Sequence, residues 1–185
     1  MPTRSGAGPS DAALVVAARA GEQWAVEALF RRYAPMINGL ALRLIGRDAD
    51  VDDLVQDCFV EALKNLGRLR EPDAVAGWLR AIVVNHASKL IRKRVLLGRL
   101  GLSREKFKVD PDLVASRNVP ADVASELSAI YRVIERLPAH LRVPLVLRRI
   151  EEFSLEEVAR LTKTSLATTK RRIGEAEQRL AGVRR

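Results

Sequence analysis

The chain contains few of the residues on which enzymes and metal proteins depend. Its 185 residues include one cysteine, Cys58, and two histidines, His86 and His140. A single cysteine excludes an internal disulfide, and no cysteine and histidine cluster has metal-ligand spacing. Phosphate-cradling glycine loops and nucleophile motifs are missing as well. The sequence therefore predicts a protein that is not an enzyme and that holds no cofactor or metal.

Long apolar runs are also missing. The longest, Ala12–Ala18, is far too short to cross a bilayer. The segment Met1–Ser10 is rich in Pro, Gly and Ser and has no apolar core, so it does not resemble a signal peptide. We expect residues 1–10 to be disordered. The protein is expected to be cytoplasmic, with no membrane contact of its own.

Charge is abundant and unevenly distributed. The formal net charge is +9. Arg47–Asn65 holds two basic and six acidic residues, whereas Lys89–Lys108 holds eight basic residues and one acidic residue. This asymmetry indicates two partners of opposite charge, with nucleic acid as the anionic one. The alternative is a solvated surface that is merely uneven in charge.

The acidic segment predicts an amphipathic helix. Its apolar residues recur at helical spacing and are expected to be buried: Leu54, Val55, Cys58, Phe59, Ala62, Leu63 and Leu66. A second face carries Asp53, Gln56, Asp57 and Val60. Such a face is suited to a basic protein surface.

The basic segment Trp78–Arg94 predicts a second helix of opposite character. Its inward residues are expected to be Leu79, Ile82, Val83, His86 and Leu90. Its outward residues are expected to be Trp78, Ala81, Asn85, Lys89 and Arg92. An indole, an amide and cations on one face are suited to unstacked bases and phosphates.

Shorter helices are expected before these two. Ser10 can cap a helix that Gly21 ends. A helix from Glu22 is expected to place Trp24 in the core and to end at Pro35, and Met36–Ile45 forms a further helix. From Leu96 to Pro120 glycine and proline interrupt the pattern, which predicts a flexible linker.

A second helical module follows the linker. An apolar repeat runs from Val123 to Leu137, and His140–Ile150 forms another helix, bent by Pro144 and exposing Arg142. Ser154 and Glu157 form a capping box.

Ser165 can cap the last helix, which makes a helix-turn-helix with its predecessor. Its inward residues are expected to be Leu166, Thr169, Ile173, Ala176 and Leu180. Thr168, Arg171, Arg172, Glu175 and Arg179 face outward. Exposed arginines can read guanine in the major groove; the alternative is a surface helix held by salt bridges.

These motifs resemble the extracytoplasmic-function sigma factors of bacterial RNA polymerase, in the sigma-70 family. Asp52-Asp53-Leu54-Val55-Gln56-Asp57 with Phe59, followed by Trp78-Leu79, Ile82 and Asn85, is similar to region 2. Leu137-Pro138, the Ser154 capping box and the run from Ser165 to Ile173 are similar to region 4. The resemblance implies an all-α fold with two small helical domains. Region 2 is expected at 11–95, the linker at 96–120 and region 4 at 121–185.

The resemblance also implies a role for each face. Asp53, Gln56, Asp57 and Val60 would bind the β′ clamp helices of core polymerase. Trp78, Asn85, Lys89 and Arg92 would hold the melted −10 strand. The −35 element would be read by Ser165, Thr168, Lys170, Arg171 and Arg172, while region 4 binds the β flap. The expected partners are core polymerase, promoter DNA and an anti-sigma factor.

Some positions depart from the family pattern, and one alternative function stays open. Val75 stands where an aromatic is common in the loop that captures a −10 base, and Glu175 and Glu177 replace residues that are often basic, which should weaken phosphate contacts. A free-standing helix-turn-helix regulator would explain Ser154–Leu180 but not the acidic helix. Strong DNA binding by the chain alone would favour that alternative.

Overall fold

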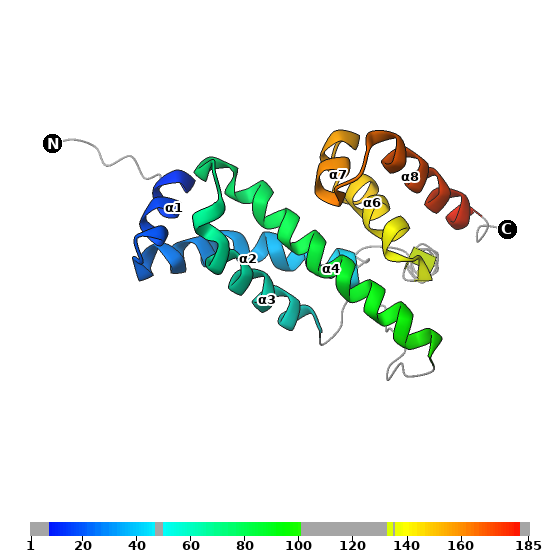
Figure 1. Cartoon of the computed structure of the whole chain (residues 1–185), viewed down its shortest axis with the longest axis horizontal. Coiled ribbons are helices and arrows are strands. Elements are labelled where there is room, and N and C mark those ends of the chain that lie inside the picture. The colour runs from blue at the N-terminus through cyan, green and yellow to red at the C-terminus, as the bar shows by residue number, and fades with distance from the viewer. Residues whose placement is uncertain (1–7, 47–49, 101–132, 135, 182–185) are drawn as a thin grey trace, which may run out of the picture.

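The computed structural model describes residues 8–46, 50–100, 133–134 and 136–181, and these residues form helices and no strand. Seven α-helices are described, in two groups (Figure 1). The all-α expectation is confirmed. Residues 101–120 of the expected linker and most of the Val123–Leu137 repeat lie outside the described residues.

The N-terminal group is a bundle of α1 (Asp11–Arg19), α2 (Gln23–Ile45), α3 (Asp50–Asn65) and α4 (Val75–Arg99). As expected, Ser10 caps α1, since its hydroxyl accepts a hydrogen bond from the Ala13 amide at 3.2 Å. Apolar residues from all four helices make one core, with Leu14, Ile37, Cys58 and Val83 fully buried.

Helix α2 corrects two expectations. It continues through Pro35 as one helix, although proline removes a hydrogen bond and was expected to end it. The face containing Ile37, Leu40 and Leu44 is buried, and this burial holds the second half of α2 in line with the first. Trp24 is 50% exposed and so is not a core residue; Ala25 and Leu29 occupy the core at this end.

Two short 3₁₀ turns, Leu66–Arg68 and Pro72–Ala74, connect α3 to α4. The Arg19 guanidinium donates to the carbonyl oxygens of Leu66, at 3.1 Å, and Leu69. This arginine therefore fixes the connection against α1. Helix α4 runs to Arg99, four residues beyond the expected end of the first domain.

The C-terminal group consists of α6 (Ala139–Arg149), α7 (Leu155–Thr162) and α8 (Leu166–Ala181). The Ser154–Glu157 capping box is present, and Lys163 adopts a left-handed conformation between α7 and α8. Helix α6 includes Pro144 without ending there. Arg142 is 3% exposed, contrary to expectation, because α6 is covered by α8, α7 and the N-terminal bundle.

The two groups are in contact. Helices α6 and α7 lie against α4, and α6 also reaches α2 (Figure 1). Arg43 of α2 forms an ion pair with Glu151, and the Arg80 guanidinium lies 5.6 Å from the ring centre of Phe153. Helix α4 therefore packs both against its own bundle and against the C-terminal group.

Candidate protein-binding and nucleic-acid-binding faces

Helix α3 presents an acidic face to solvent. Asp53, Gln56 and Asp57 are exposed, and Val60 is 42% exposed on the same side. The opposite side of the helix is buried through Leu54, Cys58 and Ala62. All four predicted core-binding residues are therefore accessible on one helix.

An apolar surface adjoins this acidic face, and the sequence pattern missed it. Leu63 was expected in the core but is 47% exposed, and Phe30 of α2 is 50% exposed. The rings of Phe30 and Phe59 lie 4.5 Å apart between centres, and both line a small apolar hollow with Leu63. Leu63 follows Phe59 by four residues and lies at the edge of the apolar stripe of α3. At such an edge position helical spacing fits either burial or exposure.

The predicted −10 residues lie along α4. Lys89 and Arg92 are exposed, whereas Trp78 and Asn85 are half-buried. Trp78 packs partly on the core, so only part of its indole is accessible to a base. Within the part of the chain that the structure describes, the Asn85 side-chain amide makes no hydrogen bond.

The buried face of α4 is wider than expected. Val84, Ala87 and Ile91 are buried in addition to Leu79, Ile82 and Val83. Val75, at the position where the family often has an aromatic, is 1% exposed. It therefore supports the start of α4 from the core side and is not available to a base.

A cleft of about 470 Å³ separates the start of α4 from α7. Trp78, Arg80 and Arg70 line one side, and Phe153 and Arg160 line the other. Of the four predicted −10 residues, Trp78 lines this cleft and so faces the C-terminal group. Phe153 and Arg160 were not predicted as site residues, because sequence spacing gives no information on contacts between the two groups.

A second groove, between α3 and α4, brings predicted residues of two classes together. Asp53 and Asp57 of the protein-binding face and Lys89 of the nucleic-acid face line the same groove. His86, expected to face the core, is half-buried beside it, and its Nε2 lies 2.6 Å from the Glu61 carboxylate.

Helix α8 presents the predicted −35 residues. Ser165 caps it by accepting a hydrogen bond from the Thr168 amide at 3.2 Å and donates its own proton to the Thr168 hydroxyl at 2.9 Å. Lys170 and Arg171 are exposed and Arg172 is half-buried. Leu166 was expected to face inward but is 37% exposed; it lies at the first turn, beyond the cover of α6.

Farther along α8 the charges are paired. Glu175 accepts a hydrogen bond from Arg179 at 2.8 Å, and Glu177 lies 2.5 Å from Arg149 of α6. The two glutamates that depart from the family pattern therefore neutralise arginines of this protein. Among the described residues, the α8 cations without an ion pair, Lys170, Arg171 and Arg172, lie in the first half of the helix.

The described residues contain no group of three or more His, Cys, Asp or Glu residues able to hold a metal ion. Burial, with Glu61 and Asp57 nearby, raises the pKa of the Cys58 thiol to about 12, so this thiol is protonated and unreactive at neutral pH. None of the described helices has the length and apolar character of a membrane span.

Comparison with known proteins gives matches over most of the chain. The model of Sigma-70 region 2 matches residues 29–95, and that of Sigma-70, region 4 matches residues 127–180. The chain is 33% identical over 173 residues to the ECF RNA polymerase sigma factor SigM of Mycobacterium tuberculosis H37Rv, covering 93% of this chain and 83% of that protein. It is 29% identical over 178 residues to the ECF RNA polymerase sigma-E factor of Escherichia coli K12, covering 91% of each.

Solved structures are similar in fold. CnrH, in complex with the cytosolic domain of CnrY, gives a TM-score of 0.61 at 28% identity, covering 95% of this chain and 97% of that chain. The sigma factor RpoE, in complex with the anti-sigma factor NepR from Bartonella quintana, gives 0.65 at 22% identity, covering 85% and 94%. Both family models and the sequence relatives show that this chain belongs to the extracytoplasmic-function sigma factors of the sigma-70 family.

Proposed function

We propose that the chain binds core RNA polymerase and directs it to promoters through three chemically distinct surfaces. The observation that carries this proposal is their separation on three helices. The acidic and apolar surface is on α3, and the surface with indole, amide and cations is on α4. The first half of α8 carries cations that make no ion pair with another described residue. A DNA-binding protein that worked alone would not need the first surface.

Asp53, Gln56, Asp57 and Val60 bind the β′ clamp helices in this proposal, and the adjoining Leu63 and Phe30 extend the contact. Charged acceptors give orientation and speed of association, while apolar contacts exclude water at the centre of an interface. The exposure of both kinds of side chain on α3 supports this assignment.

Trp78, Asn85, Lys89 and Arg92 hold the melted −10 strand. Stacking on an indole stabilises an unpaired base by about 1–3 kcal/mol, which offsets part of the cost of opening the duplex. The indole is half-buried and packed against the core, so less side-chain freedom is lost when a base stacks on its accessible surface. No catalytic group is required, and the proposed role is a regulatory and not an enzymatic one.

Region 4 reads the −35 duplex with Ser165, Thr168, Lys170, Arg171 and Arg172 and binds the β flap. Because RpoE and CnrH are solved with protein partners that include an anti-sigma factor, an anti-sigma factor is the third partner proposed for this chain. The site of action is the cytoplasm, where polymerase and promoter DNA meet.

Run-off transcription with purified core polymerase on genomic promoter fragments tests the function as a whole. Asp53→Ala with Asp57→Ala is expected to weaken core binding in a pull-down while leaving the helix content unchanged, since both side chains are exposed. Glu22→Ala with Glu27→Ala removes two exposed acids from α2 and serves as the charge-matched control. Equal core affinity for all three proteins would remove α3 from the polymerase interface.

Asn85→Ala tests the assignment of the melted strand. An amide can form hydrogen bonds with a base edge and alanine cannot, so discrimination at one −10 base is expected to be lost. Permanganate footprinting of promoter complexes measures the opening. If wild type and variant open every −10 variant equally, Asn85 has only a structural role.

A further inference from the structure

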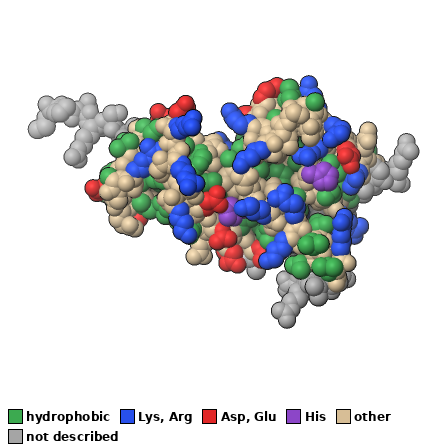
Figure 2. All heavy atoms as spheres, in the orientation of Figure 1, with side chains coloured by type: hydrophobic (Ala, Val, Ile, Leu, Met, Phe, Trp, Pro, Cys, Tyr) green, Lys and Arg blue, Asp and Glu red, His purple; other side chains and the backbone are tan. Residues whose placement is uncertain are grey.

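The groove between α3 and α4 has walls of opposite charge. It measures about 320 Å³ and is lined by Asp50, Asp53 and Asp57 from α3 and by His86, Lys89 and Lys93 from α4, with Leu54 and Leu90 also in its lining. Figure 2 shows acidic, histidine and basic side chains side by side over these two helices.

An ion pair and a contact between histidine and carboxylate engage two of the residues that line the groove, but its aspartates Asp53 and Asp57 are not joined to its lysines. Arg94 contacts Asp50 at 2.5 Å, and His86 contacts Glu61 at 2.6 Å. Among the described residues, neither lysine of the groove lies within 4.0 Å of a carboxylate oxygen. Asp53, Asp57, Lys89 and Lys93 are all exposed, so each can meet an external partner.

The aspartates Asp53 and Asp57 and the lysines Lys89 and Lys93 influence each other electrostatically across the groove. Charges separated by less than a Debye length, about 10 Å at moderate salt, are only partly screened. The aspartates therefore lower the positive potential that the lysines present to a phosphate. A nucleic acid that approaches Lys89 also meets repulsion from the nearby carboxylates.

We propose that Asp53 and Asp57 reduce the affinity of α4 for nucleic acid until a basic protein surface covers them. The inference rests on the proposed function, because the same aspartates are assigned to core polymerase and Lys89 to the melted strand. A basic surface that neutralises the aspartates leaves the field of Lys89 and Lys93 available to phosphate. By thermodynamic linkage, bound DNA strengthens the polymerase contact by the same factor.

The test measures binding of a short, fluorescein-labelled single-stranded DNA of mixed sequence by anisotropy at low salt, without polymerase. Asp53→Asn with Asp57→Asn is expected to bind about threefold to tenfold more tightly than wild type, as the sum of two weak, exposed charge interactions. The gain is expected to shrink as salt is added, since the interaction is screened.

Two further variants distinguish a local effect of the groove charges from a general effect of net charge on DNA binding. Asp52→Asn with Glu27→Gln makes the same change in net charge at exposed residues outside the groove, and a clearly smaller gain is expected. In a chain with Lys89→Gln and Lys93→Gln, the Asp53→Asn and Asp57→Asn changes are expected to give no comparable gain, because their partners are gone.

The inference is overturned if the groove variant binds no more tightly than wild type, if the control gains as much, or if the gain persists without the lysines. The DNA affinity measured by anisotropy does not depend on the outcome of the run-off transcription assay. Wild-type protein that initiates transcription while its groove variant gains no DNA affinity would refute the coupling alone. Failure of wild-type protein to initiate would refute the proposed function itself.

Discussion

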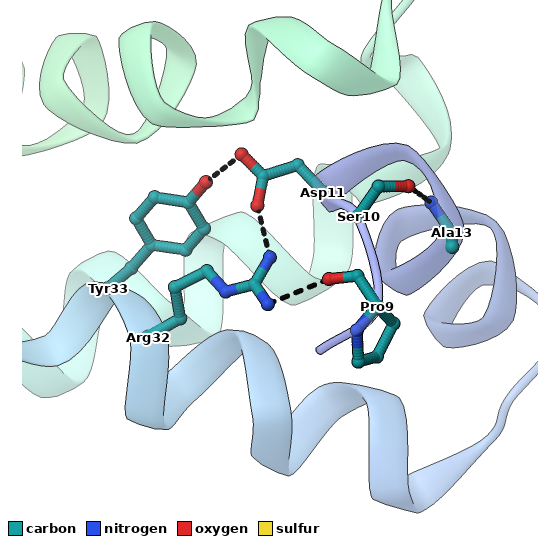
Figure 3. Close-up of polar contacts among 6 residues, drawn as sticks. All are labelled: Pro9, Ser10, Asp11, Ala13, Arg32 and Tyr33. Atoms are coloured by element: carbon teal, nitrogen blue, oxygen red, sulfur yellow. Dashed lines mark hydrogen bonds and ion pairs between the residues drawn. The ribbon is translucent and has the colours of Figure 1, made fainter. Parts of the chain in front are cut away.

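Asp11 joins the first two helices through two side chains of α2. Its carboxylate accepts hydrogen bonds from the Tyr33 hydroxyl and, at 2.6 Å, from Arg32, which also donates to the Pro9 carbonyl at 2.8 Å (Figure 3). The Tyr33 hydrogen bond is the main cause of a lowered pKa of Asp11, with Arg32 contributing. Burial and the Asp11 carboxylate raise the pKa of Tyr33.

The lowered pKa of Asp11 sets the sign of its effect on stability. A carboxylate with a lower pKa in the folded state binds protons more readily when unfolded. Its contribution to the free energy of unfolding is complete above the unfolded pKa, which is about 3.9. That contribution is lost as pH falls through the lower, folded value.

Tyr33→Phe tests this network. It keeps the buried ring but removes the hydroxyl, and we expect the free energy of unfolding at neutral pH to fall by about 1 kcal/mol. The pKa of Asp11 should rise toward its ordinary value, so the variant should lose less stability than wild type on acidification below about pH 4. Urea unfolding at several pH values and NMR titration of the Asp11 carboxyl measure both effects. Parallel pH profiles for the two proteins would contradict the assignment.

At the scale of single helices, α2 shows where burial outweighs a local signal. Pro35 is exposed and lies between helical turns whose core residues, Leu29, Ile37 and Leu40, are buried. The burial of these residues stabilises one continuous helix despite the missing hydrogen bond. Helix α2 therefore forms although Pro35 still lowers its stability by the missing hydrogen bond.

Pro35→Ala should remove that cost. Alanine restores an amide donor to the Arg31 carbonyl, so we expect the free energy of unfolding to rise by about 1–3 kcal/mol. Thermal and urea unfolding measure it. A variant less stable than wild type would mean that the core packing depends on the axis that Pro35 gives to α2.

The capped starts of helices and the charged faces could be predicted from the sequence, because both depend on local chemistry, whereas the helix end expected at Pro35 was wrong. Ser10, Ser154 and Ser165 all act as caps, and the acidic face of α3 is exposed. The errors concern cover by distant elements. Leu63 and Arg142 have helical spacing that fits either burial or exposure, and only the positions of the neighbouring helices decide between them.

In helix α8, the residues proposed to read bases can be tested separately from the paired ones. Arg171→Ala and Arg172→Ala should each spare folding. If one of these side chains contacts guanine, its variant should lose about 1–3 kcal/mol of binding and relax specificity at one −35 base. Transcription on a panel of −35 variants, with closed and pre-opened templates, measures this effect.

Arg179→Ala is the matched control, because Arg179 is engaged with Glu175 in the same helix. It should leave −35 discrimination unchanged. Full activity of the Arg171 and Arg172 double variant on every closed template would remove α8 from promoter reading.

At the scale of the whole molecule, the two groups share one apolar core cluster through α4, α6 and α7, and polar side chains join them as well. The Arg43–Glu151 ion pair and the Arg80–Phe153 contact lie beside an open cleft. An interface within one chain that leaves such a cleft permits relative domain motion. Trp78, which we propose holds the −10 strand, lines that cleft, so a base stacked on it would need the groups to separate.

Arg43→Gln with Arg80→Gln should shift the chain toward separated domains. A compact chain of this length has a radius of gyration of about 16 Å. We expect the variant to exceed wild type in small-angle scattering, with an unchanged circular dichroism spectrum. Arg149→Gln breaks an ion pair within the C-terminal group and should leave the radius unchanged. Identical radii for all three proteins would show that the apolar contacts of α6 suffice to hold the groups together.

The buried thiol of Cys58 has a practical consequence for following such motion. Since it is fully buried and protonated, thiol-directed dyes at neutral pH should not modify it in the folded chain. Two cysteines introduced at exposed positions, one on α3 and one on α8, would therefore accept a donor and an acceptor fluorophore without any change to the native residue. The distance between the helices could then be followed in single molecules while polymerase and promoter are added in turn.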